Sequence, residues 1–484
     1  MEVSEFQLIK HKTVVGLAAL IGRTFILQII TFVATFILTI ILNPAAFGVY
    51  FVVTAIISIL NYFSDIGLAA ALIQKREEPK REDYVTTFTL QQSLVITAIA
   101  VFFIFSSRIA EFFSLNNDGL WLLRALLISF FFSSLKTIPT IILERRLDFG
   151  LKVIPQILET FTFYTVAIVL AMKGFGILCF AYAAILRGLV GLIAIYIISP
   201  WKIGFGFSAK SARALLSFGI PLQGGSMLAL VKDDLMIVFL GKVLPKTELG
   251  FIGWAKKWSE APLRSFMDNI IAVSFPVYAR ISHDKGVLRS GIEKTLFFSG
   301  AFIFPSILGL MLVMKPVVHV IPHYTKWSMG LFSFYLFSIS ALLASLSSPL
   351  VQTLNALGKA KTTFVLMLLW TALTWILIPS LIYLVGFNGV SIAAVIISVT
   401  AFLPAAIVKR YVDFSFFQPL IKPVLGTLIM VAFIYPLITL LQSTIIGVIS
   451  TVVTGIAIYT VFMYLTCGND IKPYIDHLRH SKNF

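Results

Sequence analysis

Residues 249–280 form a stretch that is long enough to cross a bilayer as one helix, yet it contains charged side chains. These are Lys256, Lys257, Glu260, Arg264 and Asp268. The last four are three, four and four positions apart, so a helix places them in one stripe. Because a charge at the bilayer centre costs about 2.5–3.5 kcal/mol on insertion scales, we expect the stripe to line an aqueous substrate cavity.

A second interpretation is that the charges of the stripe neutralise one another within the helix. Lys257 and Glu260 are three positions apart, and Arg264 is four positions from both Glu260 and Asp268. Side chains at these spacings face each other on a helix and can form ion pairs. Lys256 points away from the stripe, and we expect it to extend toward the membrane surface. The sequence favours cavity lining and leaves structural pairing open.

Basic residues inside the expected spans are candidates for binding an anionic headgroup. Eight basic and six acidic residues lie within the spans, which gives them a net charge of +2. Arginine binds phosphate oxygens through two parallel N–H groups, and lysine acts as a point charge. The predicted headgroup ligands are Arg23, Lys136, Lys232, Lys257 and Arg264.

Acidic residues inside the spans are candidates for coupling transport to an ion gradient. A carboxylate that binds H⁺ or Na⁺ in only one state of the protein can drive a conformational change. Asp65, Glu159 and Asp234 are the predicted coupling residues. Two alternatives stay open: Asp65 caps the Ile66-Gly67 turn, and residues 232–234 form a local salt-bridge cluster.

Four further charged residues are predicted either to line the cavity or to form salt bridges: Arg187, Asp233, Glu260 and Asp268. We expect no metal site, because the pair His319 and His323 is interrupted by Pro322 and has no evident third ligand. The chain also lacks a phosphate-binding Gly-Lys-Ser/Thr loop, so direct use of ATP is not expected. Apart from H⁺ or Na⁺ as a coupling ion, no cofactor is expected.

Composition indicates a multi-pass membrane protein. Of the 484 residues, 58% are hydrophobic and 12% are charged, whereas about 25% are charged in a soluble protein. The net charge of +16 is explained by Lys and Arg in cytoplasmic loops, and nucleic-acid binding is not expected. The first apolar run, residues 13–41, is too long for a signal-peptide core and is expected to remain as the first span.

The apolar runs predict an all-α polytopic fold with about fourteen transmembrane helices. They lie near residues 13–41, 48–73, 84–106, 120–143, 153–172, 176–198, 214–241, 249–279, 293–318, 328–356, 362–385, 389–408, 418–441 and 443–466. With a cytoplasmic N-terminus, 24 of the 38 Lys and Arg residues lie in inside segments and six lie in outside segments. This asymmetry supports the count and predicts that both termini are cytoplasmic.

A faint internal repeat divides the chain. Aligning Gly48 with Gly250 gives an offset of 202 residues, and the glycines near residue 175 correspond to those near residue 387. Each half then has six spans in the same orientation, as in transporters with parallel repeats. We predict an N-terminal lobe of residues 1–199, a C-terminal lobe of residues 200–411, and two additional helices with a cytoplasmic tail in residues 412–484.

Several motifs together resemble a known family. Residues 62–77 read YFSDIGLAAALIQKRE, residues 143–149 read LERRLDF, and both the run from Asp234 to Phe251 and the Lys326-Trp327 turn fit the same pattern. In this order and spacing they resemble the polysaccharide flippases, the PST or Wzx-type members of the multidrug/oligosaccharidyl-lipid/polysaccharide exporter superfamily. Phe251-Ile252 departs from the tyrosine pair that is usual in the family.

The resemblance implies a transporter that moves a lipid-linked oligosaccharide across the bacterial cytoplasmic membrane by alternating access. The lipid is usually undecaprenyl pyrophosphate, and a polysaccharide polymerase or chain-length protein is an expected partner, together with membrane lipids. In a related lipid flippase the two additional helices form a groove for the lipid tail, which predicts that role for the last two spans.

Two other functions are weighed against the flippase. A membrane enzyme of polysaccharide assembly would be expected to carry catalytic residues on large outer loops, but the outer loops here are mostly short. The longest, residues 106–119, contains only Arg108, Glu111 and Asp118 as charged residues. A drug–ion antiporter of the same superfamily would be favoured by twelve spans rather than fourteen and by a more acidic cavity. The sequence therefore favours a flippase and argues against an enzyme.

Overall fold

The computed structural model describes the chain except for residues 1–21, 23, 25, 76, 442–443 and 481–484. For side chains, residues 63–65, 221–222, 224–226, 269, 272–273 and 468–480 are also outside the description. Within the described residues every regular element is a helix, which confirms the all-α prediction.

The helices follow one another with short connections. They are α2 (Pro44–Asp65), α3 (Leu68–Gln74), α4 (Arg81–Ile104), α5 (Ser106–Phe112), α6 (Asn117–Leu135), α7 (Thr137–Arg145), α8 (Phe149–Met172), α9 (Leu178–Ile198), α10 (Ala209–Lys232), α11 (Asp234–Val243), α12 (Lys246–Ile281), α13 (Lys285–Val320), η1 (Thr325–Gly330), α14 (Leu331–Ala356), α15 (Ala360–Val385), η2 (Gly386–Asn388), α16 (Gly389–Val399), α17 (Phe402–Lys409), α18 (Gln418–Leu441) and α19 (Ile445–His480).

Ten segments of the described residues are long and apolar enough to cross a membrane, so the chain is a multi-pass membrane protein. One of them, Ala360–Lys409, contains the successive helices α15, α16 and α17. The shorter helix Ile26–Ile41, the interrupted pair α10–α11 and the charged α12 are not among the ten. Each of these three coincides with an expected span, and the count of fourteen stays a prediction.

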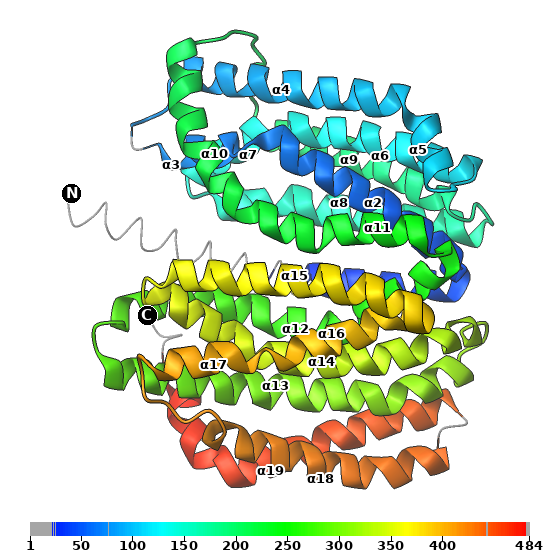
Figure 1. The fold of residues 1–484 in the computed structure, drawn as a ribbon, viewed down its shortest axis with the longest axis vertical. Helices are drawn as coiled ribbons and strands as arrows, with labels where there is room; N and C mark the ends of the chain where they lie inside the picture. The colour runs from blue at the N-terminus through cyan, green and yellow to red at the C-terminus, as the bar shows by residue number, and fades with distance from the viewer. Residues whose placement is uncertain (1–21, 23, 25, 76, 442–443, 481–484) are drawn as a thin grey trace. The chain divides into compact units, whose positions relative to one another are not determined.

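Contacts divide the chain into two compact units, Met1–Gly250 and Phe251–Phe484. Figure 1 shows the helices of each unit running side by side. In the first unit, α9 packs against α6 and α8, while α11 packs on α2 and α10 packs on α3 and α4. This division follows spatial contacts, whereas the predicted lobes follow the sequence repeat. The predicted boundaries at residues 199 and 411 therefore stay a prediction.

Two glycines let the beginnings of α2 and α12 cross at very short range within the first unit. A Cβ on Gly48 would lie 1.8 Å from the carbonyl oxygen of Lys246, and a Cβ on Gly250 would lie 1.9 Å from that of Pro44. Only glycine fits at either position, because the clash would be with backbone atoms. Both Gly48–Gly250 and Pro44–Lys246 are 202 positions apart, so this crossing has the symmetry that the repeat predicts.

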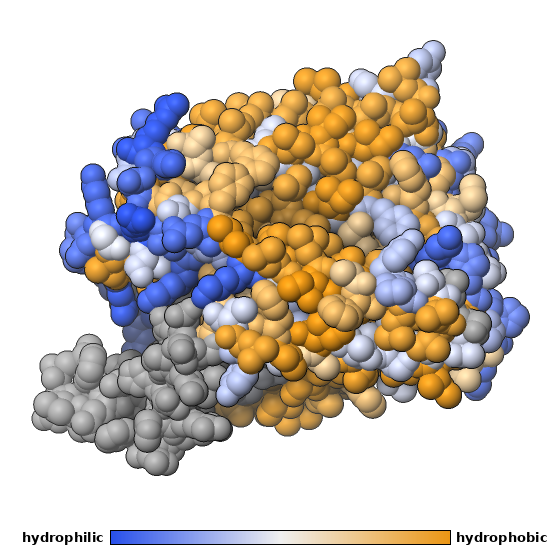
Figure 2. All heavy atoms as spheres, turned by 90° about the horizontal axis from the view of Figure 1, so that it is seen from below, coloured by the Kyte–Doolittle hydropathy of each residue, from blue (hydrophilic) through white to orange (hydrophobic). Residues whose placement is uncertain are grey.

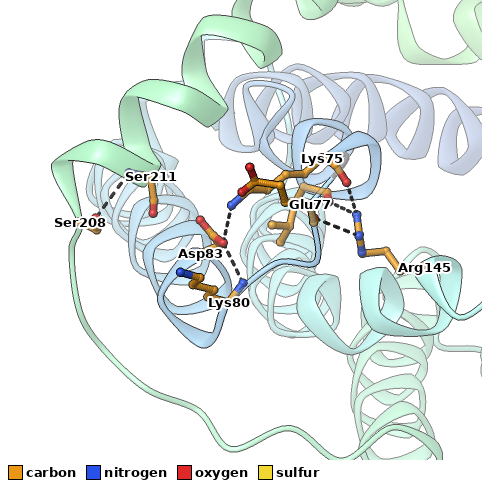
Figure 3. A network of polar contacts seen from close by, with 8 residues as sticks. Lys75, Glu77, Lys80, Asp83, Arg145, Ser208 and Ser211 are labelled. Atoms are coloured by element: carbon orange, nitrogen blue, oxygen red, sulfur yellow. Dashed lines mark hydrogen bonds and ion pairs between the residues drawn. The ribbon is translucent and has the colours of Figure 1, made fainter.

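The first two family-like motifs contact each other in the first unit (Figure 3). α2 ends at Asp65, and the left-handed residues Ile66 and Gly67 separate it from α3. Nη1 of Arg145, in the second motif, donates hydrogen bonds of 2.9 Å to the carbonyl oxygens of Leu72 and Ile73. These carbonyl groups lie in the last turn of α3, where no intrahelical N–H group is available. Arg145 thus holds the end of α3 against α7.

Beside this contact, an acidic residue at the beginning of α4 ties the connecting loop to the helix. Asp83 Oδ2 accepts hydrogen bonds from Lys75 Nζ at 2.6 Å and from the Lys80 backbone N–H group at 2.9 Å. The carboxylate sits in the first turn of α4, where the helix dipole stabilises negative charge. The motif of residues 62–77 therefore has a structural role at its C-terminal end.

In the second unit, α13 packs on α14 and α18, and α18 packs on α19. Figure 2 shows the face on which α18 and α19 lie, with a broad hydrophobic band and hydrophilic residues gathered at its two ends. Exposed side chains of these helices include Phe433, Leu440, Ile446 and Ile456. Such a face is stable where lipid tails replace water.

Candidate functional site

The charged stripe lies on α12, and much of it is accessible. Lys257, Arg264 and Asp268 are exposed, while Trp258 and Met267 are buried. Met267 belongs to an apolar cluster with Ile303 of α13 and Ala341 of α14, so packing fixes the orientation of the helix in the second unit. An exposed charge in a membrane-spanning helix needs water or a charged ligand, because lipid solvates it poorly.

Glu260 organises the cations of the stripe. Both Nε and Nη2 of Arg264 donate to its Oε2, at 3.2 and 2.9 Å, and Lys256 Nζ lies 3.9 Å from its Oε1. Both cations are four positions from Glu260, so the helix alone produces the contacts. Lys256, which the sequence placed away from the stripe, is therefore close to it. The Arg264 side chain remains 68% exposed and that of Glu260 only 22%.

A second ionic cluster lies in the first unit and joins three of the predicted site residues. Lys136 Nζ lies 2.6 Å from Glu159 Oε1, and Arg187 Nε lies 3.8 Å from Glu159 Oε2. The side chains of Lys136 and Glu159 are only 15% and 12% exposed. Lys136 joins α6 to α7, Glu159 lies in α8 and Arg187 lies in α9, so the carboxylate connects separate helices.

A glycine in α9 leaves space for the Glu159 carboxylate. A Cβ on Gly191 of α9 would lie 1.9 Å from Glu159 Oε1 and 2.4 Å from its carboxyl carbon. Any larger residue at this position would push the carboxylate away from Lys136. Arg187 is held from its other side by the Phe163 ring, whose centroid is 5.8 Å from the guanidinium carbon.

The remaining predicted residues lie elsewhere. Lys232 ends α10 and Asp234 begins α11, and the Nζ of Lys232 is 3.4 Å from Oδ1 of the intervening Asp233. This contact agrees with the local salt-bridge alternative for residues 232–234. Asp65 ends α2 at the left-handed turn, but its side chain lies outside the described residues, and so does the whole of Arg23.

The first unit contains a polar pocket that the sequence did not predict. Its volume is about 370 Å³, and its lining includes Gln91, Ser133, Ser134, Lys136 and Thr137. The lining has two charged residues, Lys136, whose ammonium group is bound by Glu159, and Glu144, which pairs with Lys152. The available signal was the adjacent amide pair Gln91-Gln92 in a span without charged residues, together with the hydroxyl-bearing residues around Lys136 in the next span.

The second unit contains an apolar pocket of about 210 Å³ between α13, α14 and α18. Phe304, Leu308, Leu346 and Leu428 are among its lining residues, and Thr427 is the only polar residue there. Such a lining suits a hydrocarbon chain rather than a saccharide. The pocket uses one of the two additional C-terminal helices, α18.

Comparison with known proteins identifies the relatives of the chain. It is 21% identical over 469 residues to the succinoglycan biosynthesis transport protein ExoT of Rhizobium meliloti, covering 93% of this chain and 92% of that protein. It is 27% identical over 427 residues to the lipopolysaccharide biosynthesis protein WzxC of Escherichia coli, covering 87% and 83%. Both matches extend over most of each chain, so the similarity is not confined to one segment.

The fold is that of a known lipid transporter. The structure of the lipid II flippase MurJ in an inward closed conformation aligns with a TM-score of 0.74, covering 95% of this chain and all of that one at 15% identity. At this identity the match shows a shared fold. It includes the region of α18 and α19, because nearly the whole chain is aligned.

A family model described as "Polysaccharide biosynthesis protein" matches residues 37–329, which is more than half of the chain. This agrees with the motifs around residues 62–77 and 143–149 and with the relatives found over the full length. Of these proteins, ExoT is named as a transport protein and MurJ as a flippase, which supports a transporter rather than an enzyme. The chain therefore belongs to the polysaccharide biosynthesis protein family, the polysaccharide flippases with a MurJ-like fold.

Proposed function

We propose that this protein moves a lipid-linked oligosaccharide, carried on undecaprenyl pyrophosphate, across the bacterial cytoplasmic membrane by alternating access. The observation that carries the proposal is the exposed, cation-bearing stripe of α12 in a polysaccharide flippase fold. Charges that remain exposed in such a helix need an aqueous path and can compensate a charged group that enters it. Family membership supplies the class of substrate, and the stripe supplies a place for its headgroup.

Lys257 and Arg264 are proposed as the principal headgroup ligands. Both are exposed, and they lie on the same side of α12 because seven residues correspond to about two helical turns. Arg264 is oriented by Glu260 while most of its side chain stays accessible. Arginine and lysine together suit a pyrophosphate, since one supplies a fork of donors and the other a point charge. Arg23, Lys136 and Lys232 remain further candidates.

A short segment of the lipid tail is proposed to occupy the apolar pocket between α13, α14 and α18. A polyprenyl chain has no hydrogen-bonding groups. When it binds to a lining of Phe and Leu side chains, no polar side chain there is left without a hydrogen-bond partner. The pocket lies in the second unit, which also contains the charged part of α12. The same unit thus offers separate polar and apolar surfaces to an amphipathic substrate.

We propose that an H⁺ or Na⁺ gradient drives the cycle through a carboxylate. Asp234 and Asp65 are the principal candidates, since each lies where a span is interrupted. Glu159 is a weaker candidate, because a bound cation would have to compete with Lys136 and Arg187. We also propose that both termini are cytoplasmic and that the protein associates with a polysaccharide polymerase or chain-length protein.

The test is a flipping assay in proteoliposomes that contain a defined undecaprenyl-pyrophosphate-linked glycan. The double variant Lys257→Gln/Arg264→Gln is expected to lower the initial rate at least about tenfold, because two charge-assisted contacts to the headgroup are lost. A pH jump and a Na⁺ jump on vesicles of the original protein test the coupling. If neither jump changes the rate, ion coupling is wrong.

Arg289→Gln provides the matched control. Arg289 also pairs with a glutamate four positions away, Glu293, at 2.9 Å, but it lies in the first two turns of α13. Its replacement removes the same charge and the same type of ion pair without touching the stripe, so transport should stay near that of the original protein. Equal transport by the double variant and the original protein would rule out the stripe as the headgroup site.

A further inference from the structure

The polar pocket of the first unit has the architecture of a binding site for an uncharged, hydroxyl-rich ligand. Its volume of about 370 Å³ is within the range of about 300–1,000 Å³ that is usual for small-molecule sites. Asn61 and Ser133 are exposed at its mouth, whereas Gln91 and Ser134, each 5% exposed, lie deeper in its lining. A ligand would thus pass from accessible to buried polar groups.

Gln91 has an unused hydrogen-bonding atom in this pocket. Its Nε2 donates to Thr137 Oγ1 at 2.9 Å, but its Oε1 is buried and accepts no hydrogen bond from the described residues. A buried acceptor without a donor destabilises the fold by about 1–3 kcal/mol. Exchanging the amide oxygen and nitrogen does not remove the problem, because Thr137 can satisfy only one of them. The site therefore calls for a donor from a ligand or from water.

The charges around the pocket favour a neutral ligand over an anion or a cation. Lys136 is paired with Glu159 at 2.6 Å, and Glu144, the other ionisable residue of the lining, is paired with Lys152. A phosphate would have to draw Lys136 away from Glu159, and a metal ion would meet ammonium groups beside each carboxylate. Sugar hydroxyl groups both donate and accept, which matches amide and hydroxyl side chains.

We propose that this pocket binds one uncharged sugar residue of the transported glycan, with a sugar hydroxyl donating to Gln91 Oε1. The identity of the ligand rests on the proposed function, whereas the existence of the site rests on the pocket itself. Headgroup binding on α12 and sugar binding in the first unit are then separate contacts of one substrate. Sugar recognition is assigned to hydroxyl and amide groups, and the charge of the headgroup plays no part in it.

Cysteine protection tests the site directly. Cys179 and Cys467 are both buried, and they are the only cysteines of the chain, so Ser133→Cys places one accessible thiol at the mouth of the pocket. The full-length variant in nanodiscs is labelled with a hydrophilic maleimide in the presence of three probes. These are undecaprenyl pyrophosphate bearing N-acetylglucosamine, undecaprenyl pyrophosphate without sugar, and free N-acetylglucosamine at millimolar concentration.

The sugar-bearing lipid is expected to slow labelling of Ser133→Cys at least about fivefold, while the sugarless lipid leaves the rate unchanged. Free sugar should protect only at the highest concentrations, because it lacks the tethering that the lipid provides. Ser107→Cys, exposed at the beginning of α5, is the labelling control and should be unaffected by all three probes. Equal rates with and without the sugar-bearing lipid would mean that the pocket holds water alone, and the proposal would be wrong.

Gln91→Leu in the Ser133→Cys background is expected to raise the probe concentration needed for protection about tenfold. Gln92→Leu is the matched control. Gln92 is an equally buried neighbour whose Oε1 accepts from Ser134 at 3.2 Å, and it does not line the pocket. Equal loss of protection in both variants would indicate damage to the fold of α4 and would contradict a specific role of Gln91.

The flipping assay separates this proposal from the proposed function. If the protein flips the lipid but no probe protects Ser133→Cys, the sugar site is wrong and the flippase stands. If the sugar-bearing lipid protects the thiol but no flipping is detected, the sugar site stands and the transport proposal fails.

Discussion

Glu159 and Glu260 are two glutamates that each face two cations, but their surroundings differ. The partners of Glu159 come from other helical segments, Lys136 at the α6–α7 junction and Arg187 in α9. Those of Glu260, Lys256 and Arg264, lie one turn away on the same helix. The first carboxylate therefore joins helices together, whereas the second only arranges charges along one helix.

This difference predicts different uses of the two clusters. Ionic groups that are shielded from water contribute through close geometry, and removal of one partner leaves an uncompensated charge. Exposed i,i+4 pairs contribute little to stability, because water solvates both charges when the pair opens. The cluster of Glu159 should thus matter chiefly for folding, and the cluster of Glu260 for what binds to α12.

Glu159→Gln is expected to have the largest effect on stability. It leaves the Lys136 ammonium group without its carboxylate in a site where both side chains are largely shielded. Loss of one partner from a buried pair costs about 3–5 kcal/mol, and partial access to the polar pocket should place this variant near the lower limit. The midpoint of thermal unfolding in detergent, followed by tryptophan fluorescence, measures the change.

The double replacement Lys136→Met/Glu159→Leu is the control for this prediction. Substituting both members of a buried ion pair by apolar residues of similar size is often neutral or stabilising, because no charge remains to be compensated. Most of the lost stability should return. If the double variant is as unstable as Glu159→Gln, packing around residue 159 rather than charge compensation explains the effect.

Gly191→Ala is expected to have an intermediate effect and to show whether the geometry of the Glu159 cluster matters. The added Cβ would lie 1.9 Å from Glu159 Oε1, so the carboxylate has to move away from Lys136. Overpacking of this kind costs about 1–3 kcal/mol, partly offset by about 0.5–1 kcal/mol from the higher helix propensity of alanine. The midpoint of thermal unfolding again measures the change.

Gly188→Ala lies on the same helix, one turn away, and is the matched control. Its added Cβ would be 3.1 Å from the Phe132 ring and 3.2 Å from Ser129 Oγ, which are small displacements for side chains. The gain in helix propensity should nearly cancel the crowding at this position. Equal destabilisation by the two alanines would show that α9 tolerates no added volume and that the carboxylate plays no special part.

Most of the fold could be predicted from the sequence. The long apolar runs predicted the helices α4, α8, α9, α13 and α14, because each is bounded by charged or glycine-containing loops. The expected span 48–73 runs across Ile66-Gly67, whereas in the structure α2 ends at Asp65 and both following residues adopt the left-handed conformation. Gly48 and Gly250 indicated the internal repeat, but the close crossing of α2 and α12 at these glycines is visible only in the structure.

The contacts within the candidate site could be predicted less well from the sequence, for physical reasons. Lys136 and Glu159 are 23 positions apart on different helices, so no local spacing indicates that they pair. Arg145 binds backbone carbonyl groups of α3, which every sequence possesses. The pocket around Gln91 is lined mostly by uncharged residues from several helices, and none of them indicates a pocket by itself. The charged stripe of α12 and the contact between Lys232 and Asp233 were readable, because both follow from the spacing of residues along the chain.

Glu260→Gln makes the same chemical change as Glu159→Gln, but in the exposed cluster. We expect it to have the smallest effect on stability, below about 0.5 kcal/mol for each i,i+4 pair.

The same substitution is expected to raise the affinity of α12 for an anionic headgroup. Without the carboxylate, Arg264 and Lys256 are no longer drawn to Glu260, and α12 carries one more net positive charge. Binding of undecaprenyl pyrophosphate without sugar should therefore strengthen about threefold to tenfold at low salt, and less at high salt because ions screen exposed charges. Equilibrium binding in nanodiscs at two salt concentrations, beside the unfolding midpoint, measures both quantities. A large fall in the unfolding midpoint with unchanged affinity would mean that Glu260, like Glu159, serves the fold, and the distinction between the two clusters would disappear.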